Sequence, residues 1–433
     1  MNSKLQTSWL IENGRIICPA SGIDRIGRLL LRQGLIDAMD PSDDQVPSDA
    51  QRIDASGHIV APGLVDLGTE IGEPGREEDE TIETATMAAL AGGFTTIACA
   101  PNTDPPIDTA QAVEFVRQKA ARADRCRVCV IGCVSKGREG QELAEIGSLV
   151  DAGAVALSDY PGPINNAALM RRALEYCLMF DRYILDRPEV PSLTRHGIMH
   201  EGMMQLILAL APMPAEAEDL ATSRNLRLLE TTGGKLHLSC VSTAGSIDLI
   251  RRAKERGITV SVGTRIANLC FDDESMRSFD ANLKVNPPLR SREHIEACRA
   301  ALADGTIDVL TSGHQPRALE KKMQELSAVP FGMSTLDTAV AQVVTYLIRP
   351  GHLSWQRALE AFSTKPAHVL GVEAGSLQVG RPADVVLIDP EQQWTVCKDD
   401  FYSRSRNNPL VGQTLFGRVK SVFVGGQRKF VRD

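Results

Sequence analysis

The stretch Gly92-Gly93-Phe94-Thr95-Thr96-Ile97-Ala98-Cys99-Ala100 decides the fold class of this chain. Two glycines lead into a run of small, apolar and β-branched residues, and this pattern predicts a strand at 95–100. A helical pattern follows at 109–121, and a second apolar run begins at residue 127. Because a strand, a helix and another strand form the repeating unit of parallel sheets, we expect an α/β fold.

The same alternation continues through the middle of the chain. Strands are predicted at 64–67, 95–100, 127–133, 154–158, 182–185, 235–240, 259–264 and 308–311. Helical patterns lie at 109–121, 141–151, 215–231, 246–255 and 292–303. Eight strand and helix units over about 300 residues favour a (β/α)8 TIM-like barrel. The alternative is an open doubly wound sheet, but no Gly-x-Gly-x-x-Gly follows an early strand and no Gly-x4-Gly-Lys-Ser/Thr loop is present.

Both ends of the chain carry short apolar runs separated by polar turns, a pattern typical of β structure. Residues 383–388 and 419–424 read as strands, and Gly425-Gly426 reads as a hairpin turn. We therefore expect a small β-sandwich domain assembled from residues 1–61 and 366–433, with the barrel at residues 62–365.

Composition excludes several classes of protein. The 433 residues are 43% hydrophobic and carry a formal net charge of -8, which excludes disorder and argues against a nucleic-acid surface. No apolar run is long enough to span a membrane, and the first residues lead into no secretory signal. The 10 cysteines read as small buried hydrophobes, since Cys126 and Cys129 should face opposite sides of one strand. We expect a cytoplasmic protein.

Several short motifs resemble dihydroorotases of the amidohydrolase superfamily. They are Pro62-Gly63-Leu64-Val65-Asp66, residues 73–81, Ala91-Gly92-Gly93-Phe94-Thr95-Thr96, Pro101-Asn102-Thr103, residues 214–218, Val241-Ser242-Thr243-Ala244-Gly245, Lys284-Val285-Asn286-Pro287-Pro288-Leu289-Arg290, Pro330-Phe331-Gly332 and residues 380–384. The run at 284–290 is the most specific of these, and together they cover nearly the whole chain. The resemblance implies that the family hydrolyses or closes the dihydroorotate ring at a zinc centre.

The resemblance also implies where the zinc ligands should stand, and this chain departs from them. The seven degenerate positions are Gly68, Glu70, Asp159, Tyr160, Tyr183, Cys240 and Gly313. Other departures are Gly72 in place of a substrate-clamping arginine, Leu185 near strand five, Ala267-Asn268 after strand seven and Arg317 in place of a further histidine. Because glycine has no side chain to coordinate a metal, we expect no zinc, no other cofactor and no enzymatic activity.

Two alternatives remain for these positions. A rebuilt mononuclear metal site could combine Glu70, Asp159, Asp186, Cys240 and His314, although they read more readily as polar remnants of a lost site. Cys240 could act as a nucleophile, but the sequence shows no neighbouring base or cation to activate it. The substrate-pocket residues Asn102, Asn286 and His314 are retained, and Arg290 follows in the same motif; Asn286 equally suits a turn cap.

Three functions remain as hypotheses. The first is a non-catalytic dihydroorotase homologue that serves as a scaffold subunit for aspartate transcarbamoylase in pyrimidine biosynthesis, because the sequence resembles such chains. We expect such a subunit to form a dimer or a larger homo-oligomer. The second is an active cyclic-amide hydrolase of the dihydroorotase or hydantoinase kind with a rebuilt mononuclear metal site. The third is a sensor that binds an anion similar to dihydroorotate or carbamoyl aspartate.

Overall fold

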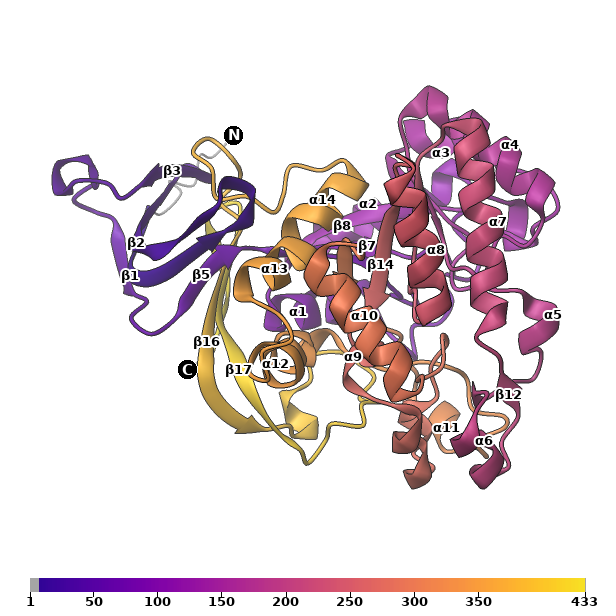
Figure 1. Cartoon of the computed structure of the whole chain (residues 1–433). Coiled ribbons are helices and arrows are strands. Elements are labelled where there is room, and N and C mark those ends of the chain that lie inside the picture. The colour runs from indigo at the N-terminus through magenta and orange to yellow at the C-terminus, as the bar shows by residue number, and fades with distance from the viewer. Residues whose placement is uncertain (1–7, 433) are drawn as a thin grey trace.

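The computed structural model describes residues 8–432 and has two parts. Figure 1 shows a barrel surrounded by helices on the right and a twisted β domain on the left, where the C-terminal strands β16 and β17 lie beside the N-terminal strands. The α/β fold predicted from the sequence is therefore confirmed.

The barrel consists of eight parallel strands in the order β15-β14-β13-β10-β9-β8-β7-β6. Their bounds are β6 (Leu64–Thr69), β7 (Phe94–Cys99), β8 (Arg127–Gly132), β9 (Ala154–Leu157), β10 (Ile184–Asp186), β13 (Leu236–Leu238), β14 (Ser261–Arg265) and β15 (Val309–Thr311). Side chains bridge the gap between the first and last strands, because the backbone N–H of Ser312 donates to Asp66 Oδ1 at 2.7 Å and its hydroxyl donates to Oδ2 at 2.8 Å. All eight predicted strands are present in a nearly closed barrel.

Helices cover the outside of the barrel. Among them are α1 (Ile82–Ala91), α2 (Ala110–Ala123), α3 (Ile146–Asp151), α4 (Ala167–Cys177), α7 (Glu216–Thr232), α8 (Ala244–Glu255) and α10 (Arg292–Asp304). Short helices at the mouth are α5 (Pro191–Thr194), α6 (Met203–Leu208), α9 (Ala267–Cys270) and α11 (Leu319–Lys322), near the two-residue strands β11 (Met199–His200) and β12 (Pro212–Met213). Threonine caps begin α2 and α8, where Thr109 and Thr243 accept from backbone N–H groups three residues later.

One predicted helix is shorter than expected. The pattern at 141–151 predicted a helix throughout, but α3 begins only at Ile146. The preceding residues are held in an extended arrangement, because Leu143 pairs with Ser135 in an isolated bridge and Ala144 N donates to Val134 O at 2.9 Å. Tertiary pairing overrides the local helical pattern here.

The β domain combines both ends of the chain in one sheet, ordered β18-β17-β16-β5-β1-β2-β3, with β4 paired to β1. Its strands are β1 (Trp9–Cys18), β2 (Ile23–Arg32), β3 (Leu35–Met39), β4 (Gln51–Asp54), β5 (Ile59–Pro62), β16 (Val385–Thr395), β17 (Thr414–Val424) and β18 (Gln427–Val431). Gly425 and Gly426, both with positive φ, form the predicted hairpin turn between the last two strands. The exact domain boundaries stay a prediction.

Apolar side chains fill the barrel interior. Val65, Leu67, Ala98, Ile131, Ala156, Leu185 and Val309 point inward from the strands and pack with residues of α14 (Lys365–Leu370). Helices α12 (Ala339–Val343) and α13 (Trp355–Leu359) precede α14 along the chain. Since α14 closes the amino-terminal end of the barrel, the mouth lies at the opposite end, where the strands finish. No helix within residues 8–432 is long and apolar enough to cross a membrane.

Candidate functional site

The first feature of the mouth is a buried carboxylate just after β6. Glu70 is 1% exposed, and its Oε2 lies 2.8 Å from Nη1 of Arg317, while Gln315 Nε2 donates to Oε1 at 2.5 Å. Burial alone would raise the pKa of Glu70, but the charge and hydrogen bond of Arg317, assisted by Gln315, lower it to about 2. Glu70 is thus a permanent anion whose oxygens are already committed to protein partners.

The second feature is Arg265, which ends β14 and is only 2% exposed. Its Nε donates to Cys240 Sγ at 3.1 Å, and its Nη1 donates to the Asn286 carbonyl at 2.8 Å and to Gln315 Oε1 at 3.0 Å. Its Nη2 donates to the hydroxyl of Tyr160, so three of its nitrogens have partners. Arg265 was not among the residues predicted from the sequence, although its guanidinium makes four hydrogen bonds at the mouth.

Two predicted ligand positions after β9 contribute polar groups in different ways. Asp159 accepts from the backbone N–H groups of Val134 and Ser135, each at 3.0 Å, and from the Ser135 hydroxyl at 2.6 Å. Burial raises the pKa of Asp159 despite these hydrogen bonds. Burial also raises the pKa of Tyr160, against the opposing charge of Arg265. Asp159 therefore holds its own loop, and Tyr160 joins the arginine cluster.

Tyr183 is not part of the mouth, which corrects the predicted list of ligand positions. It precedes β10 rather than following it, and its ring packs edge-on against His368 of α14 with centroids 6.5 Å apart. The strand occupies only Ile184–Asp186, so its end was placed too early along the sequence. Asp186 is the residue that ends β10, and it accepts from Asn225 Nδ2 at 2.6 Å and Ile164 N at 2.8 Å.

The three retained substrate-pocket residues have different surroundings. Asn286 accepts from Arg187 Nη1 at 3.0 Å and donates to Glu189 at 3.1 Å, so an ion pair holds its amide. The ring of His314 is fully buried, with Nδ1 accepting from Thr335 N and Leu336 N and Nε2 lying 3.3 Å from Glu80 Oε2. The Oδ1 atom of Asn102 lacks a partner among the described residues. Of these three residues, only Asn102 has a buried side-chain oxygen without a hydrogen-bond partner among the described residues.

The residues at the predicted ligand positions do not fit a zinc centre. Gly68 and Gly313 offer no donor atoms, and Glu70 and Asp159 are committed to Arg317 and Ser135. No group of three or more histidine, cysteine, aspartate or glutamate side chains within residues 8–432 is arranged to hold a metal ion. The five residues considered for a mononuclear site also do not form a common metal site, since Glu70 and Asp159 have the partners just named and His314 contacts Glu80.

The central cavity at the mouth is small. It measures about 20 Å³, and Gly68, Ser158, Tyr160, His237, Cys240 and Arg265 are among the residues that line it. Such a space holds about one water molecule. Two larger pockets are lined by other residues: one of about 680 Å³ next to Asn286 and Lys284, and a cleft of about 910 Å³ between α11 and the segment 404–411.

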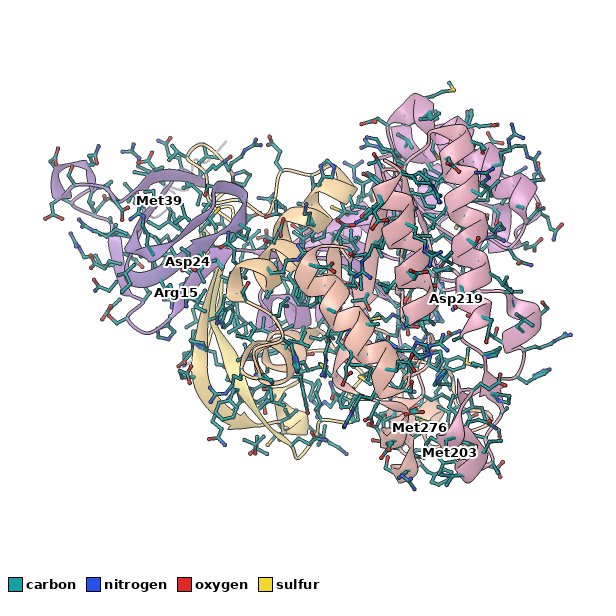
Figure 2. The ribbon with its side chains drawn as sticks, in the orientation of Figure 1. Arg15, Asp24, Met39, Met203, Asp219 and Met276 are labelled. Atoms are coloured by element: carbon teal, nitrogen blue, oxygen red, sulfur yellow. The ribbon has the colours of Figure 1, made fainter. Side chains whose placement is uncertain are left out.

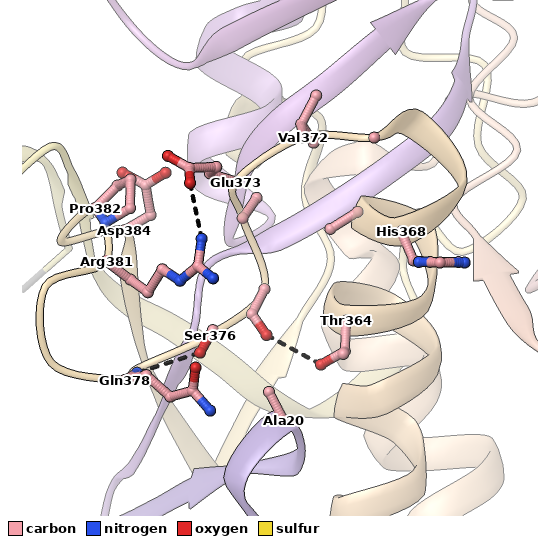
Figure 3. Close-up of a pocket in the computed structure, with 14 residues that line it drawn as sticks. Ala20, Thr364, His368, Val372, Glu373, Ser376, Gln378, Arg381, Pro382 and Asp384 are labelled. Atoms are coloured by element: carbon pink, nitrogen blue, oxygen red, sulfur yellow. Dashed lines mark hydrogen bonds and ion pairs between the residues drawn. The ribbon is translucent and has the colours of Figure 1, made fainter. Parts of the chain in front are cut away.

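A further pocket, of about 420 Å³, lies where the end of α14 and the segment after it meet the β domain (Figure 3). Its charged groups have protein partners, since Arg381 Nη1 donates to Glu373 Oε1 at 2.8 Å and Asp384 Oδ2 lies 3.0 Å from Arg127 Nε. Because α14 closes the amino-terminal end of the barrel, this pocket is remote from the residues of the mouth. We assign it no functional role.

Comparison with known proteins identifies the family. The model of the amidohydrolase family matches residues 59–429. The chain belongs to the amidohydrolase family. Among solved structures, an L-hydantoinase (dihydropyrimidinase) from Arthrobacter aurescens is 25% identical with a TM-score of 0.87, over 97% of this chain and 95% of that one.

Curated relatives give a finer comparison. A dihydroorotase from Caldanaerobacter subterraneus is 40% identical over 98% of this chain and 97% of its own length, and one from Anaeromyxobacter dehalogenans is 42% identical over 96% of each. A relative from Rhodopirellula baltica, named provisionally as a dihydroorotase, is 52% identical over 98% of this chain and 93% of its own length. The chain is therefore dihydroorotase-like.

These comparisons overturn one prediction made from the sequence. The changes at the ligand positions led us to expect that the chain is not an enzyme. Relatives at 40% to 42% identity over nearly the whole chain are named dihydroorotases, and the structural neighbour is named a hydantoinase. Both names denote hydrolases. The prediction of inactivity is accordingly wrong, and the chain is a member of a hydrolase family.

Proposed function

We propose that this dihydroorotase-like chain works as the partner-binding subunit of an assembly with aspartate transcarbamoylase. The full-length similarity to dihydroorotases supports a place in pyrimidine-ring chemistry, and the resemblance of the sequence supports this partner. The structural observation that carries the proposal is an apolar surface beside the barrel mouth. A chain that works alone would have little reason to leave such a surface open to water.

The apolar surface has two parts. On α6, Met203, Leu206 and Ile207 are 73%, 70% and 55% exposed, while Met204 of the same helix is buried against a local apolar core. On and after α11, Leu319 and Met323 are 70% and 75% exposed. Figure 1 shows α6 and α11 at the same end of the molecule, and Figure 2 labels Met203 at that end. Methionine and leucine suit an adaptable protein interface.

Charge adds to this surface. The cleft beside α11 is lined by Arg317, Lys322, Lys398, Arg404 and Arg406 but only by the carboxylates Glu78, Asp280 and Glu320. Arg317 is paired with Glu70, and burial lowers the pKa of Lys322 to about 7, so three exposed cations stand beside three carboxylates and the cleft carries both signs of charge. A partner surface with apolar anchors and charged neighbours of both signs would match the apolar surface and this cleft. A stable interface of standard size buries about 1,600 Å² in total, and the apolar surface would supply its core.

The first prediction tests this assembly. We expect the wild-type chain to elute as a dimer or larger, and to form a heavier complex when mixed with aspartate transcarbamoylase from the same organism. Size-exclusion chromatography with light scattering measures both masses. A Met203→Glu, Leu206→Glu double variant should lose the heavier complex, because each substitution places a charge in the apolar core of the interface.

A matched control separates loss of binding from loss of folding. Met179, which lies just after α4, is also 73% exposed, and Met179→Glu should leave the complex intact. If the wild-type mixture elutes as the sum of its components, the proposed partner is wrong. If the complex forms and the Met203→Glu, Leu206→Glu variant keeps it, the partner stands and the assigned surface is wrong.

A second candidate function is hydrolysis of a cyclic amide, and the names of the relatives favour it. Since the mouth does not fit zinc, we derive no step through a metal. The assay is ring opening of dihydroorotate and ring closure of carbamoyl aspartate by the purified chain. Saturable turnover that disappears in Asp159→Asn would support this function, and a rate equal to that without protein would count against it.

A further inference from the structure

We propose that the guanidinium group of Arg265 occupies the position of a metal cation at the barrel mouth. This inference is independent of the partner proposed above. It rests on where the predicted ligand positions converge in space. Arg265 contacts Cys240 and Tyr160 directly, and it lines the same cavity as Gly68. Glu70 is linked to Arg265 through the side-chain amide of Gln315, which accepts from Arg265 and donates to Glu70.

Gly313 gives the strongest link. A Cβ atom added at this residue would meet Arg265 Cδ at 2.9 Å, Cγ at 3.0 Å and Cβ at 3.3 Å. The arginine stem therefore fills the space that a side chain at 313 would need. Gly313 also has a φ of +69°, which favours glycine. The loss of a side chain at 313 and the presence of an arginine at 265 thus depend on each other.

The surroundings of Arg265 match what a buried cation requires. Its hydrogen bonds run to a thiol, a phenol, a side-chain amide and a backbone carbonyl, and its guanidinium carbon lies 5.6 Å from the centre of the Tyr160 ring. Burial alone would lower the pKa of Arg265, but Cys240, Tyr160 and Glu70 outweigh it and raise the pKa further. The mouth therefore holds a cation that stays charged and that no chelator can remove.

The contacts also show what this cation holds together. Cys240 follows β13, Tyr160 follows β9, Asn286 belongs to the loop after β14, and Gln315 follows β15. One guanidinium thus ties four separate loops of the mouth and leaves a central cavity of only about 20 Å³. A metal bound by several loops would perform the same cross-linking. Arg265 is accordingly a positioning residue for the whole mouth.

The dependence between residues 265 and 313 is tested by a double-mutant cycle on the full chain. Unfolding in urea gives an equilibrium constant for each variant. We expect Gly313→Ala to raise this constant about tenfold or more above the value for Gly305→Ala. Gly305 is the matched control because its φ is +86° and nothing lies within 4 Å of its added Cβ. In an Arg265→Ala background, the extra effect of Gly313→Ala should disappear.

Metal titration of the wild-type chain provides the second test. The midpoint of thermal unfolding should be the same with a chelator and with added zinc, because the guanidinium already occupies the site. Three results would overturn the proposal: equal effects of Gly313→Ala and Gly305→Ala, strict additivity in the cycle, or a saturable rise of the midpoint with one equivalent of zinc. If Arg265→Ala does not fold, the single glycine variants and the zinc titration still decide.

Discussion

Replacing Glu218 with alanine should lower the free energy of unfolding by about 3 to 5 kcal/mol, because the change leaves a buried arginine without its counter-charge. Glu218 on α7 is 3% exposed, and Arg290 Nη2 lies 3.5 Å from its Oε2. Its Oε1 also accepts from the backbone N–H groups of Ser242 at 2.8 Å and Thr243 at 3.0 Å. One carboxylate therefore holds both the loop after β13 and the arginine of the 284–290 motif.

Urea unfolding at pH 7 measures this effect, and Glu216→Ala on the same helix is the matched control. Glu216 is exposed, so its removal should change the free energy of unfolding by no more than about 0.5 kcal/mol. Equal effects of the two substitutions would show that the buried pair contributes no net stability. Glu218→Gln should fall between them, because an amide keeps some hydrogen bonds but not the charge.

The structure gives Arg290 a role that the sequence left open. The sequence placed Arg290 in the same motif as Asn286 without giving it a role. In the structure Arg290 is only 3% exposed and donates from Nε to Ser242 Oγ at 3.1 Å and from Nη1 to the Met213 carbonyl at 3.3 Å. Its partner Glu218 lies in another quoted motif, 72 residues earlier in the chain. Two motifs that were noted separately thus form one structural unit.

The barrel could be predicted because its signal is local and repeated. Most strands are short apolar runs, and several helices begin at a capping residue such as Thr109 or Thr243. Prediction failed where tertiary contacts decide the backbone. Residues 141–145 look helical but pair with the loop after β8, and the three-residue strand β10 gives too short a pattern to locate its end.

The arrangement of the mouth was less accessible to sequence reasoning. The loss of metal-coordinating side chains at Gly68 and Gly313 can be inferred from the sequence alone, because glycine has no side chain. Arg265 carries no such signal, since an arginine at the end of a strand usually reaches solvent. Its importance follows only from the convergence of Tyr160, Cys240 and Gln315 on one point, and these residues are far apart in the sequence.

The second large effect concerns the buried pair of Glu70 and Arg317, which makes the free energy of unfolding depend on pH. The pKa of Glu70 is about 2 in the folded chain, against an ordinary value of 4.5. A lowered pKa contributes stability that is fully present above about pH 4.5 and is lost as the pH falls towards 2. A shift of this size corresponds to about 3 kcal/mol at pH 7.

We therefore expect Glu70→Gln to lower the free energy of unfolding by about 3 kcal/mol at pH 7, and by clearly less at pH 3. At pH 3 the unfolded wild type binds a proton that the folded wild type does not, so the advantage of the carboxylate is smaller. Urea unfolding at both pH values measures the difference. Glu78→Gln is the control, since its ion pair with Lys321 is exposed and should contribute at most about 1 kcal/mol. A gap between wild type and Glu70→Gln that is the same at both pH values would mean that Glu70 is not held as an anion by Arg317.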